Sequence, residues 1–333
     1  MTTEATADVF AGIDVGAKEL VLVIRKNAMS MKAQTFANTP AERLRLVKRL
    51  SAFPAITVCL EATGVYYLDL ALVLTDAGLR LNVLNPKASH NFAKVLLRNS
   101  KTDAVDADTL AQYAERMPYQ PWARPADEAL ALRALARRIN TLTRNKAAAK
   151  NQLHALSFSP ETPKAVLRDL TLSITQLEKR IERLALDATT FIQAHPLLAR
   201  PFSLLRTVKG IAATSAIALL GELLLLPQGL THKQWVKAAG LDPRHFTSGT
   251  SVAKPARLSK AGNHYIRQAL YMPALSAKAH DPYVRGFFEH LIALGKTPLQ
   301  AVCAVMRKLL HAIHGMLTHD QVFDNTRFYA LPA

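Results

Sequence analysis

Cysteine is scarce in this chain, and its scarcity excludes two kinds of small structural site. Only Cys59 and Cys303 occur among 333 residues; they lie far apart in sequence, and neither belongs to a Cys-x-x-Cys pair. Zinc sites and disulfide frameworks usually need several closely spaced cysteines, so neither is expected. Two isolated thiols are typical of a reducing compartment, and we therefore expect a cytoplasmic protein.

Long hydrophobic runs and a signal sequence are also missing. The most apolar stretch, residues 217–226, is broken by Gly221 and Glu222 and is followed by Pro227. A membrane-spanning helix needs about 20 consecutive apolar residues. The first residues do not show the charged-then-apolar pattern of a secretory signal. These observations predict a soluble protein that has no membrane partner.

Acidic residues are few, whereas basic residues are abundant. The chain has 42 Lys and Arg against 25 Asp and Glu, which gives a formal net charge of +17. Cationic side chains that dock on phosphates release condensed counterions, so this excess favours a nucleic acid as the partner. A ribosomal or chromatin-like binder would share this composition, and so would a basic protein without such a partner. Because 50% of the residues are hydrophobic, a disordered chain is excluded.

Residues 1–125 show the alternation of strands and helices that is typical of an α/β domain. Five short apolar runs predict strands, at residues 9–13, 20–24, 33–37, 56–60 and 81–84. Helical segments are expected between the later strands and after the last, one from Pro40 and another from Asp103. Three strands followed by this alternation predict a mixed sheet. The order is that of the ribonuclease H arrangement, although other α/β folds would also fit.

Residues 126–195 are predicted to form two long helices that fold back on each other around Pro160 and Pro163. In the second helix, apolar residues recur at alternating steps of four and three, the pattern of a coiled coil: Leu170, Ile174, Leu177, Ile181, Leu184, Ala188 and Phe191. The pair either packs only within the chain or serves as a dimerisation arm whose outer face lies on nucleic acid. The basic residues of that face are Arg133, Arg137, Arg138, Arg144 and Lys150.

Residues 196–333 are predicted to form a third, mainly helical domain. One stretch, residues 240–260, contains Ser, Thr, Gly, Pro, Arg and Lys but little periodicity, and we interpret it as a long loop. Loops of that length inside a compact domain are more often functional than idle. The candidate nucleic-acid-binding residues in and beside this stretch are Arg244, Lys254, Arg257, Lys260 and Arg267.

Four acidic residues occupy positions that an α/β fold would bring together. Asp14 and Glu61 each follow an apolar strand, and Asp103 and Asp106 lie three apart on one face of a helix. Strand-end residues collect at the carboxyl edge of a sheet. Four clustered carboxylates repel one another unless cations neutralise them, and one or two Mg²⁺ ions are the usual choice with phosphate substrates. Taken singly, an Asp after a strand is commonly a turn former, and Asp103 could simply cap a helix. Asp108 is expected to face away as a solvated neighbour.

The surroundings of these acids resemble a known family. Glu-Ala-Thr-Gly from Glu61, Lys-Thr-Asp-x-x-Asp through Asp103 and Asp106, and Arg-Leu-Ser-Lys-Ala-Gly at residues 257–262 are similar to the DEDD transposases of the insertion-sequence 110 family. The resemblance implies an amino-terminal RuvC-like ribonuclease H domain whose DEDD acids, beginning with Asp14, are catalytic and bind Mg²⁺. It implies a coiled-coil region and a carboxy-terminal transposase domain. It also implies a recombinase whose structured bridge RNA pairs with donor and target DNA, and dimers that join into a tetramer.

By the same resemblance, Ser248 matches the family's catalytic serine. A serine beside Gly249 can approach a phosphate closely, but its hydroxyl is a weak nucleophile until a base or a metal activates it. Nearby cations would stabilise the charge that develops on the phosphate. A phosphoserine intermediate would allow strand exchange without ATP, with the acids and the serine acting on one phosphate, within one subunit or across two. Ser251 and Ser259 are competing nucleophiles, and His245 is a candidate base.

One motif is a partial match. Residues 205–212, Leu-Arg-Thr-Val-Lys-Gly-Ile-Ala, resemble a helix-hairpin-helix turn, which presents backbone amides to phosphate. Ala212 stands where the motif has its second glycine, so a purely structural turn is an equal alternative. Lys209 is the candidate nucleic-acid contact of this turn.

Two other functions remain open from the sequence. The four acids and the fold would also serve a metal-dependent nuclease or junction resolvase that hydrolyses DNA while Ser248 is idle. A non-enzymatic nucleic-acid-binding protein would need none of the acids for its function. Substitution of Ser248 separates the first two possibilities, and substitution of Asp14 separates both from the third.

Overall fold

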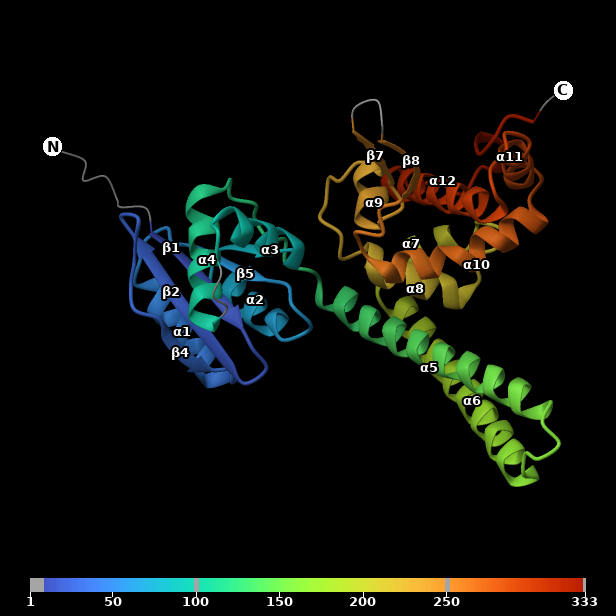
Figure 1. Ribbon diagram of the computed structural model, residues 1–333, viewed down its shortest axis with the longest axis horizontal. Helices are drawn as coiled ribbons and strands as arrows, with labels where there is room; N and C mark the ends of the chain where they lie inside the picture. Colours follow the sequence, from blue (N-terminus) through green and yellow to red (C-terminus); the bar gives the residue numbers. More distant parts are fainter. Residues whose placement is uncertain (1–8, 99–101, 249–251, 332–333) are drawn as a thin grey trace. The chain divides into compact units, whose positions relative to one another are not determined.

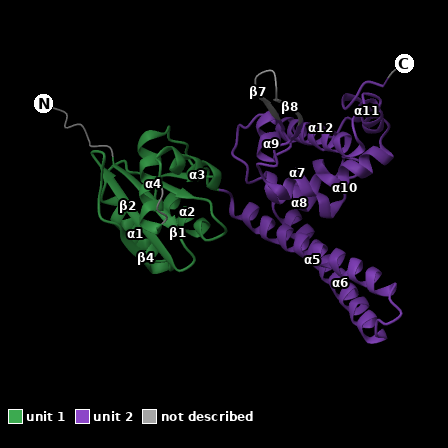
Figure 2. Ribbon diagram, in the orientation of Figure 1, with its two compact units in different colours: residues 1–124 green, residues 125–333 purple. Residues whose placement is uncertain are grey.

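The computed structural model describes residues 9–98, 102–248 and 252–331, and the chain divides into two compact units, residues 1–124 and 125–333 (Figure 2). Within these described ranges, the chain forms twelve α-helices and eight strands (Figure 1). None of the helices described is long and apolar enough to cross a bilayer. The predicted combination of an α/β part and a helical part is confirmed, whereas the division into three domains stays a prediction.

Unit 1 is built on one mixed sheet. Its strands are β1 (Val9–Val15), β2 (Glu19–Lys26), β3 (Met29–Ser30), β4 (Gln34–Ala37), β5 (Thr57–Glu61) and β6 (Arg80–Leu84). The order is β3-β2-β1-β5-β6, and β4 also pairs with β2. Strand β1 runs antiparallel to β2 but parallel to β5, which is in turn parallel to β6. The predicted mixed sheet is confirmed, with the short β3 as an addition.

Helices cover both faces of this sheet (Figure 1). They are α1 (Pro40–Ser51), α2 (Tyr67–Asp76), α3 (Pro86–Val95) and α4 (Asp103–Arg116). Alternate residues of β2 separate the two faces: Leu22 belongs to the core under α1 and α2, whereas Val21 and Val23 pack with Ala107 of α4. This alternation is the period of two that a strand buried on both faces requires.

Gly12 explains how α4 comes to lie directly on β1. A Cβ atom at this position would be 2.0 Å from the Ala107 carbonyl oxygen and 2.3 Å from the Ala111 amide nitrogen, both main-chain atoms of α4. Only glycine leaves room for the helix backbone to approach so closely. Because Asp14 is the penultimate residue of β1 and α4 begins at Asp103, this contact places the start of the helix near the end of the strand.

Unit 2 begins with a helical hairpin formed by α5 (Asp127–Ser157) and α6 (Lys164–Ala194), which pack along each other. Helix α5 also packs against α8 (Ala213–Leu223). Toward the tip of the hairpin the seam becomes more accessible, since Leu153 and Leu170 are only half-buried. The two predicted long helices are thus present, and their description as a coiled coil stays a prediction.

The remaining helices of unit 2 surround a single apolar core. They are α7 (Pro196–Leu205), α9 (His232–Ala238), α10 (His264–His280), α11 (Pro282–Ala293), α12 (Pro298–His319) and the 3-10 helix η1 (Asn325–Arg327). Fully buried leucines of four helices, Leu205, Leu220, Leu270 and Leu309, meet in this core. This part of the chain is mainly helical, as its sequence predicts.

The prediction of an irregular loop over residues 240–260 is wrong. Strands β7 (Pro243–Ser248) and β8 (Val252–Leu258) form an antiparallel hairpin there, with a register irregularity between Arg244 and Phe246. The stretch does not show the alternation of apolar and polar residues by which a half-buried strand is recognised. Main-chain pairing holds such a hairpin without that signal.

Candidate active site

Two neighbouring parallel strands of unit 1, β1 and β5, bring acids to the same edge of the sheet. Ile13 of β1 pairs with Leu60 of β5, so Asp14 and Glu61 are the next residues on the two strands, at their carboxyl ends. The carboxylate of Glu61 accepts hydrogen bonds from the hydroxyls of Thr63 and Ser89. Ser89 belongs to α3, so this helix and the turn after β5 together orient Glu61. Sequence reasoning missed both hydroxyls, although Thr63 lies within the Glu-Ala-Thr-Gly motif.

The other two acids lie in the first turn of α4. Thr102 is the N-cap of this helix, and its hydroxyl accepts a hydrogen bond from the Val105 amide at 3.3 Å. Asp103 is therefore the first helical residue and not the cap. Asp103 is exposed and Asp106 is half-buried. Negative charge in the first turn also interacts favourably with the helix dipole.

The four acids influence one another electrostatically. Burial, followed by repulsion from Asp103, Asp106 and Glu61, raises the pKa of Asp14 to about 6, against a smaller opposing effect of a Val15 backbone hydrogen bond. Such repulsion is expected where β5 pairs with β1 and α4 packs on it, because it falls with distance. The carboxyl end of β1 is accordingly a concentration of negative charge in a basic protein.

The carboxylate oxygens at this edge are the right type of ligand for a divalent cation, but they are not arranged around a common point. Across the described ranges, no three Asp, Glu, His or Cys side chains are grouped so that they could hold one metal ion as placed. Carboxylate oxygens are nevertheless the ligands that Mg²⁺ prefers. The raised pKa of Asp14 is the expected property of such a set without a counterion. Rotation of side chains, including release of Glu61 from its hydroxyl partners, would be needed for coordination.

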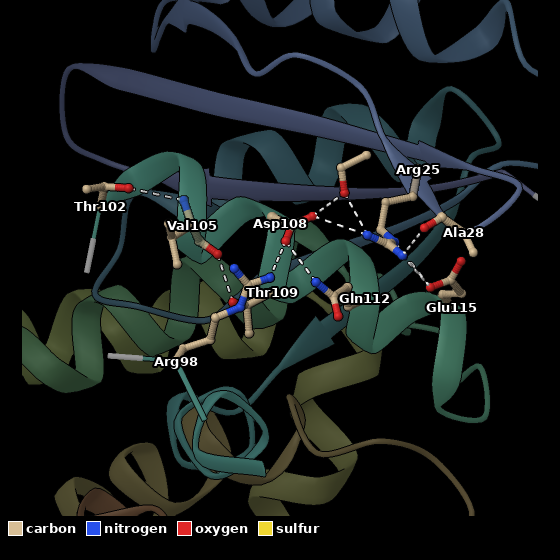
Figure 3. Close-up of polar contacts among 10 residues, drawn as sticks. Arg25, Ala28, Arg98, Thr102, Val105, Asp108, Thr109, Gln112 and Glu115 are labelled. Carbon is tan, nitrogen blue, oxygen red and sulfur yellow. Dashed lines mark hydrogen bonds and ion pairs between the residues drawn. The ribbon is translucent and has the colours of Figure 1, made fainter. Parts of the chain in front are cut away.

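Asp108 does not face solvent, contrary to the prediction. Figure 3 shows its carboxylate among Arg25, Arg98 and Gln112. The Arg25 guanidinium lies 3.4 Å from a carboxylate oxygen, and the Gln112 side-chain amide donates to the carboxylate at 2.8 Å. The Arg98 guanidinium and the Ser30 hydroxyl also donate hydrogen bonds to it. Burial alone would raise the pKa of Asp108, but hydrogen bonds from Ser30, Gln112 and Arg98 outweigh it and hold the pKa below its usual value. Asp108 therefore anchors α4 and is not part of the acid cluster.

Arg25 is the centre of this anchor (Figure 3). It is only 6% exposed, and its guanidinium also pairs with Glu115 at 3.0 Å and donates to the Ala28 carbonyl oxygen at 2.7 Å. Asp108 and Glu115 lie two turns apart on one face of α4, so both clamp the helix to β2. This clamp fixes the helix that carries Asp103. A basic residue within an apolar strand is the sequence signal that would have indicated it.

Ser248 is the last residue of β7, and its main chain pairs with that of Val252. The side chains of residues 245–255 lie outside the described part of the structure, and these include the candidates Ser248, His245, Ser251 and Lys254. The third candidate serine is engaged elsewhere. The Ser259 hydroxyl donates to the Asp242 carboxylate at 2.5 Å, and its amide donates to the Asp242 carbonyl oxygen at 2.9 Å. Ser259 thus closes the base of the hairpin.

Most of the predicted nucleic-acid-binding residues that the structure describes are exposed. They are Arg138, Arg144, Lys150, Lys209, Arg244, Arg257 and Lys260, of which Lys150 pairs with Glu178 at 3.1 Å. Arg133 is half-buried. Lys209 precedes a turn whose Gly210, at φ +97°, lies against α10, since a Cβ there would be 2.7 Å from the Pro273 carbonyl oxygen. One side of that turn is therefore occupied by protein.

Two of the predicted cations hold unit 2 together. The Arg137 guanidinium pairs with the buried carboxylate of Glu222 at 2.7 Å and lies over the Tyr265 ring at 4.3 Å. Arg267 donates to the main-chain carbonyl oxygens of Ala239 at 2.7 Å and Gly262 at 3.2 Å. Arg137 joins α5 to α8 and α10, and Arg267 fixes the two ends of the segment that contains the hairpin.

Two family models match this chain, one over unit 1 and most of α5 and the other within unit 2. A transposase model of the DEDD type found with IS110 matches residues 11–156. A second model, described as the transposase IS116/IS110/IS902 family, matches residues 202–289. The first match includes all four acids, and the second includes the β7–β8 hairpin.

Known proteins resemble the chain over most of its length. The pilin gene-inverting protein of Moraxella bovis is 30% identical over 267 residues, which cover 80% of this chain and 81% of that protein. Its counterpart from Moraxella lacunata is 30% identical over 270 residues, with the same coverage. The insertion element IS900 uncharacterized 42 kDa protein of Mycobacterium paratuberculosis is 26% identical, over 95% of this chain and 97% of that one.

Among solved structures, RuvC of Thermus thermophilus is similar to 34% of this chain over 99% of its own length, with 17% identity and a TM-score of 0.27. The same protein in complex with a Holliday junction substrate gives the same values. The family that the motifs predict is confirmed by the matched models and by the relatives that share four fifths of their length with the chain. The chain therefore belongs to the IS116/IS110/IS902 family of transposases and is a DNA transposase or recombinase enzyme.

Proposed function

We propose that this transposase cuts and rejoins DNA strands at donor and target sites with a metal-dependent carboxylate cluster and a serine nucleophile. The observation that carries the proposal is the meeting of Asp14 and Glu61, at the ends of paired strands, with the first turn of α4, which packs on β1. Burial and repulsion from Asp103, Asp106 and Glu61 accordingly raise the pKa of Asp14 to about 6. Acids that oppose one another's ionisation are suited to a divalent cation, which offsets the repulsion. Carboxylate sites of this composition serve phosphodiester chemistry when they hold such ions.

One or two Mg²⁺ ions would be held by Asp14, Glu61, Asp103 and Asp106 in a RuvC-like domain. When bound, the metal polarises the phosphate and stabilises charge on the attacking and leaving oxygens. The remaining work belongs to the chain itself. Helix α4 supplies two acids from one turn, and its close packing on β1 sets their distance from Asp14. The hydroxyls of Thr63 and Ser89 hold the Glu61 carboxylate in this structure, and the carboxylate would turn away from them to bind an ion.

Ser248 is proposed as the nucleophile. Its Oγ attacks the phosphorus of the scissile phosphodiester, the bond to the leaving strand breaks, and the hydroxyl proton passes to a base while the leaving strand takes up a proton. The phosphoserine that forms retains an ester bond, so the hydroxyl of a second strand can replace the serine without ATP. The match of the Ser248 segment to the family and its place at the end of β7 support this role.

A structured bridge RNA is proposed as the guide, and a homodimer that pairs into a tetramer as the assembly. The net charge of +17 and exposed cations such as Arg138, Arg144 and Lys209 support contacts with nucleic acid. We assign the acids to a domain at residues 1–125, a coiled-coil arm to residues 126–195 and the serine to a domain at residues 196–333. Recombination that needs RNA transcribed from the DNA flanking the element would support the guide, and recombination by RNA-free protein would exclude it.

A recombination assay on the element's ends and a target plasmid, with Mg²⁺ and RNA, tests the chemistry. Wild type should yield joined products and a protein–DNA adduct that survives denaturation. Ser248→Ala and Asp14→Asn should yield neither, whereas Asp187→Asn, which changes an exposed acid of α6, should behave as wild type. Strand cutting by Ser248→Ala would instead indicate a metal-dependent nuclease or resolvase. Full activity of Asp14→Asn would leave the acids with a structural role only.

A further inference from the structure

A groove of about 680 Å³ lies in unit 2, between the base of the β7–β8 hairpin and the first turns of α12. Apolar side chains contribute to its lining, among them Leu241, Leu258 and Cys303. Three cationic side chains also line it: Arg257, Lys260 and Arg307. The twelve lining residues include no acid. The groove therefore combines apolar surface with uncompensated positive charge.

The cations of the groove are available to a ligand. Arg257, Lys260 and Arg307 are all exposed, and none forms an ion pair within the described ranges. Lys260 and Cys303 line the same groove. Burial raises the pKa of the Cys303 thiol, and Lys260 partly offsets the rise. The main chain of Lys260 adopts a left-handed conformation, with φ +51°, and its amide donates to the Gly240 carbonyl oxygen at 3.1 Å. A non-glycine residue held in this way is often found at a functional position.

This combination favours a single nucleic-acid strand over a duplex. Proteins hold single strands with cations along the phosphates and with apolar, aromatic or guanidinium surfaces against the bases. A duplex turns its bases inward, so it could use the cations but not the apolar lining. Guanidinium groups pair with carboxylates as well as with phosphates, so an acidic protein segment would also fit the cations. A nucleic acid is favoured because the chain is a DNA transposase.

The position of the groove connects it with the chemistry proposed for the hairpin. Strands β7 and β8 pair Pro243 with Leu258 at the groove and Ser248 with Val252 at the other end. The five steps from Pro243 to Ser248 span about 17 Å at the rise of a β-strand. A strand seated in the groove and running along the hairpin would reach Ser248 within a few nucleotides.

We propose that this groove binds a single strand of DNA beside the bond that Ser248 attacks, with Arg257, Lys260 and Arg307 on its phosphates. The inference rests on the proposed function and names where the cut strand is held. Arg307, from α12, is the member that sequence reasoning did not single out. Binding here would keep the strand in place while its end is exchanged.

Thiol alkylation of full-length wild-type protein in EDTA tests binding without catalysis. Cys303 lines the groove, whereas Cys59 is fully buried in unit 1 and serves as the internal control. A single-stranded DNA 12-mer should slow alkylation of Cys303 by N-ethylmaleimide several-fold, as followed by mass spectrometry. Duplex DNA of the same sequence should protect it less. Absence of protection, or equal protection by the duplex, would overturn the proposal.

Anisotropy of the labelled 12-mer supplies the second measurement. Lys260→Ala and Arg307→Ala should each weaken binding and lower the slope of log K against log salt by about 0.7, the value for one phosphate contact of a single strand. Arg307→Lys should restore the slope, and Arg183→Ala, an exposed arginine of α6, should leave it unchanged. Unchanged slopes in the two groove variants would contradict the assignment. If DNA protects Cys303 but the recombination assay yields no serine–DNA adduct, only the serine chemistry is refuted. If the adduct forms but DNA does not protect Cys303, only the groove assignment is refuted.

Discussion

Replacement of Asp14 by Asn should stabilise the metal-free protein at neutral pH. Burial and repulsion from three acids raise the pKa of Asp14 from 3.8 to about 6 in the folded state. A carboxyl whose pKa is higher in the folded than in the unfolded chain holds its proton more tightly when folded, so its ionisation lowers stability. This cost is absent below the unfolded pKa, grows as the pH rises to about 6, and is complete above it. Asparagine has nearly the same shape without the charge and removes the cost.

The size of the effect follows from the shift. Two pKa units correspond to at most about 3 kcal/mol. Asp14 is partly exposed, and solvent screens its repulsion, so the expected gain in the free energy of unfolding is about 1–2 kcal/mol. Mg²⁺ should act in the opposite direction, because it binds the ionised cluster of the folded wild type. At ten times its dissociation constant it adds about 1.4 kcal/mol to wild-type stability.

Urea unfolding followed by tryptophan fluorescence measures this for unit 1 alone. Trp122 packs against the core of that unit, and Trp235→Phe removes the only other tryptophan. In EDTA near neutral pH, Asp14→Asn should be more stable than wild type, and the difference should shrink toward pH 4.5. Mg²⁺ should stabilise wild type and not the variant, with Asp187→Asn matching wild type throughout. A variant less stable than wild type in EDTA, or an equal response of both to Mg²⁺, would refute the reasoning.

Three further substitutions test the supports of the site, each by urea unfolding. Gly12→Ala places a methyl group 2.0 Å from the Ala107 carbonyl oxygen, so it should cost about 3 kcal/mol and displace α4; unchanged stability would contradict the close packing. Asp108→Ala removes one partner of the buried Arg25 and should cost about 2–3 kcal/mol. Glu222→Gln should cost about 1–2 kcal/mol in unit 2 because it breaks the pair of the buried Glu222 carboxylate with the partly exposed Arg137, and a neutral result would show that pair to be dispensable.

The acid cluster was predictable from the sequence because each acid stands beside a strong local signal. Asp14 and Glu61 terminate apolar runs, and Asp103 and Asp106 share a helix turn, so the α/β topology alone brings them to one edge. The hydroxyls that orient Glu61 were not predictable in the same way. Ser89 reaches it from a separate helix, and no local pattern specifies that contact.

Asp108 and the β7–β8 hairpin show where sequence reasoning fails. The partners of Asp108 include Arg25, which lies on a distant strand, so the periodicity of its own helix placed it in solvent. The hairpin has no apolar alternation, and only main-chain pairing reveals it. Arg137 was assigned to nucleic acid from its place on a helix face, whereas its guanidinium pairs with Glu222, which lies far along the chain. Long-range polar contacts of this kind carry no signal in local sequence.

Counting bound Mn²⁺ by equilibrium dialysis tests most directly whether the ends of β1, β5 and α4 share one cation site. Wild type should bind one or two ions per chain. Neutral amide replacements at Asp14, Glu61, Asp103 and Asp106 should each weaken that binding markedly, while Asp187→Asn binds as wild type does. Undiminished Mn²⁺ binding by the four single variants would contradict a shared site.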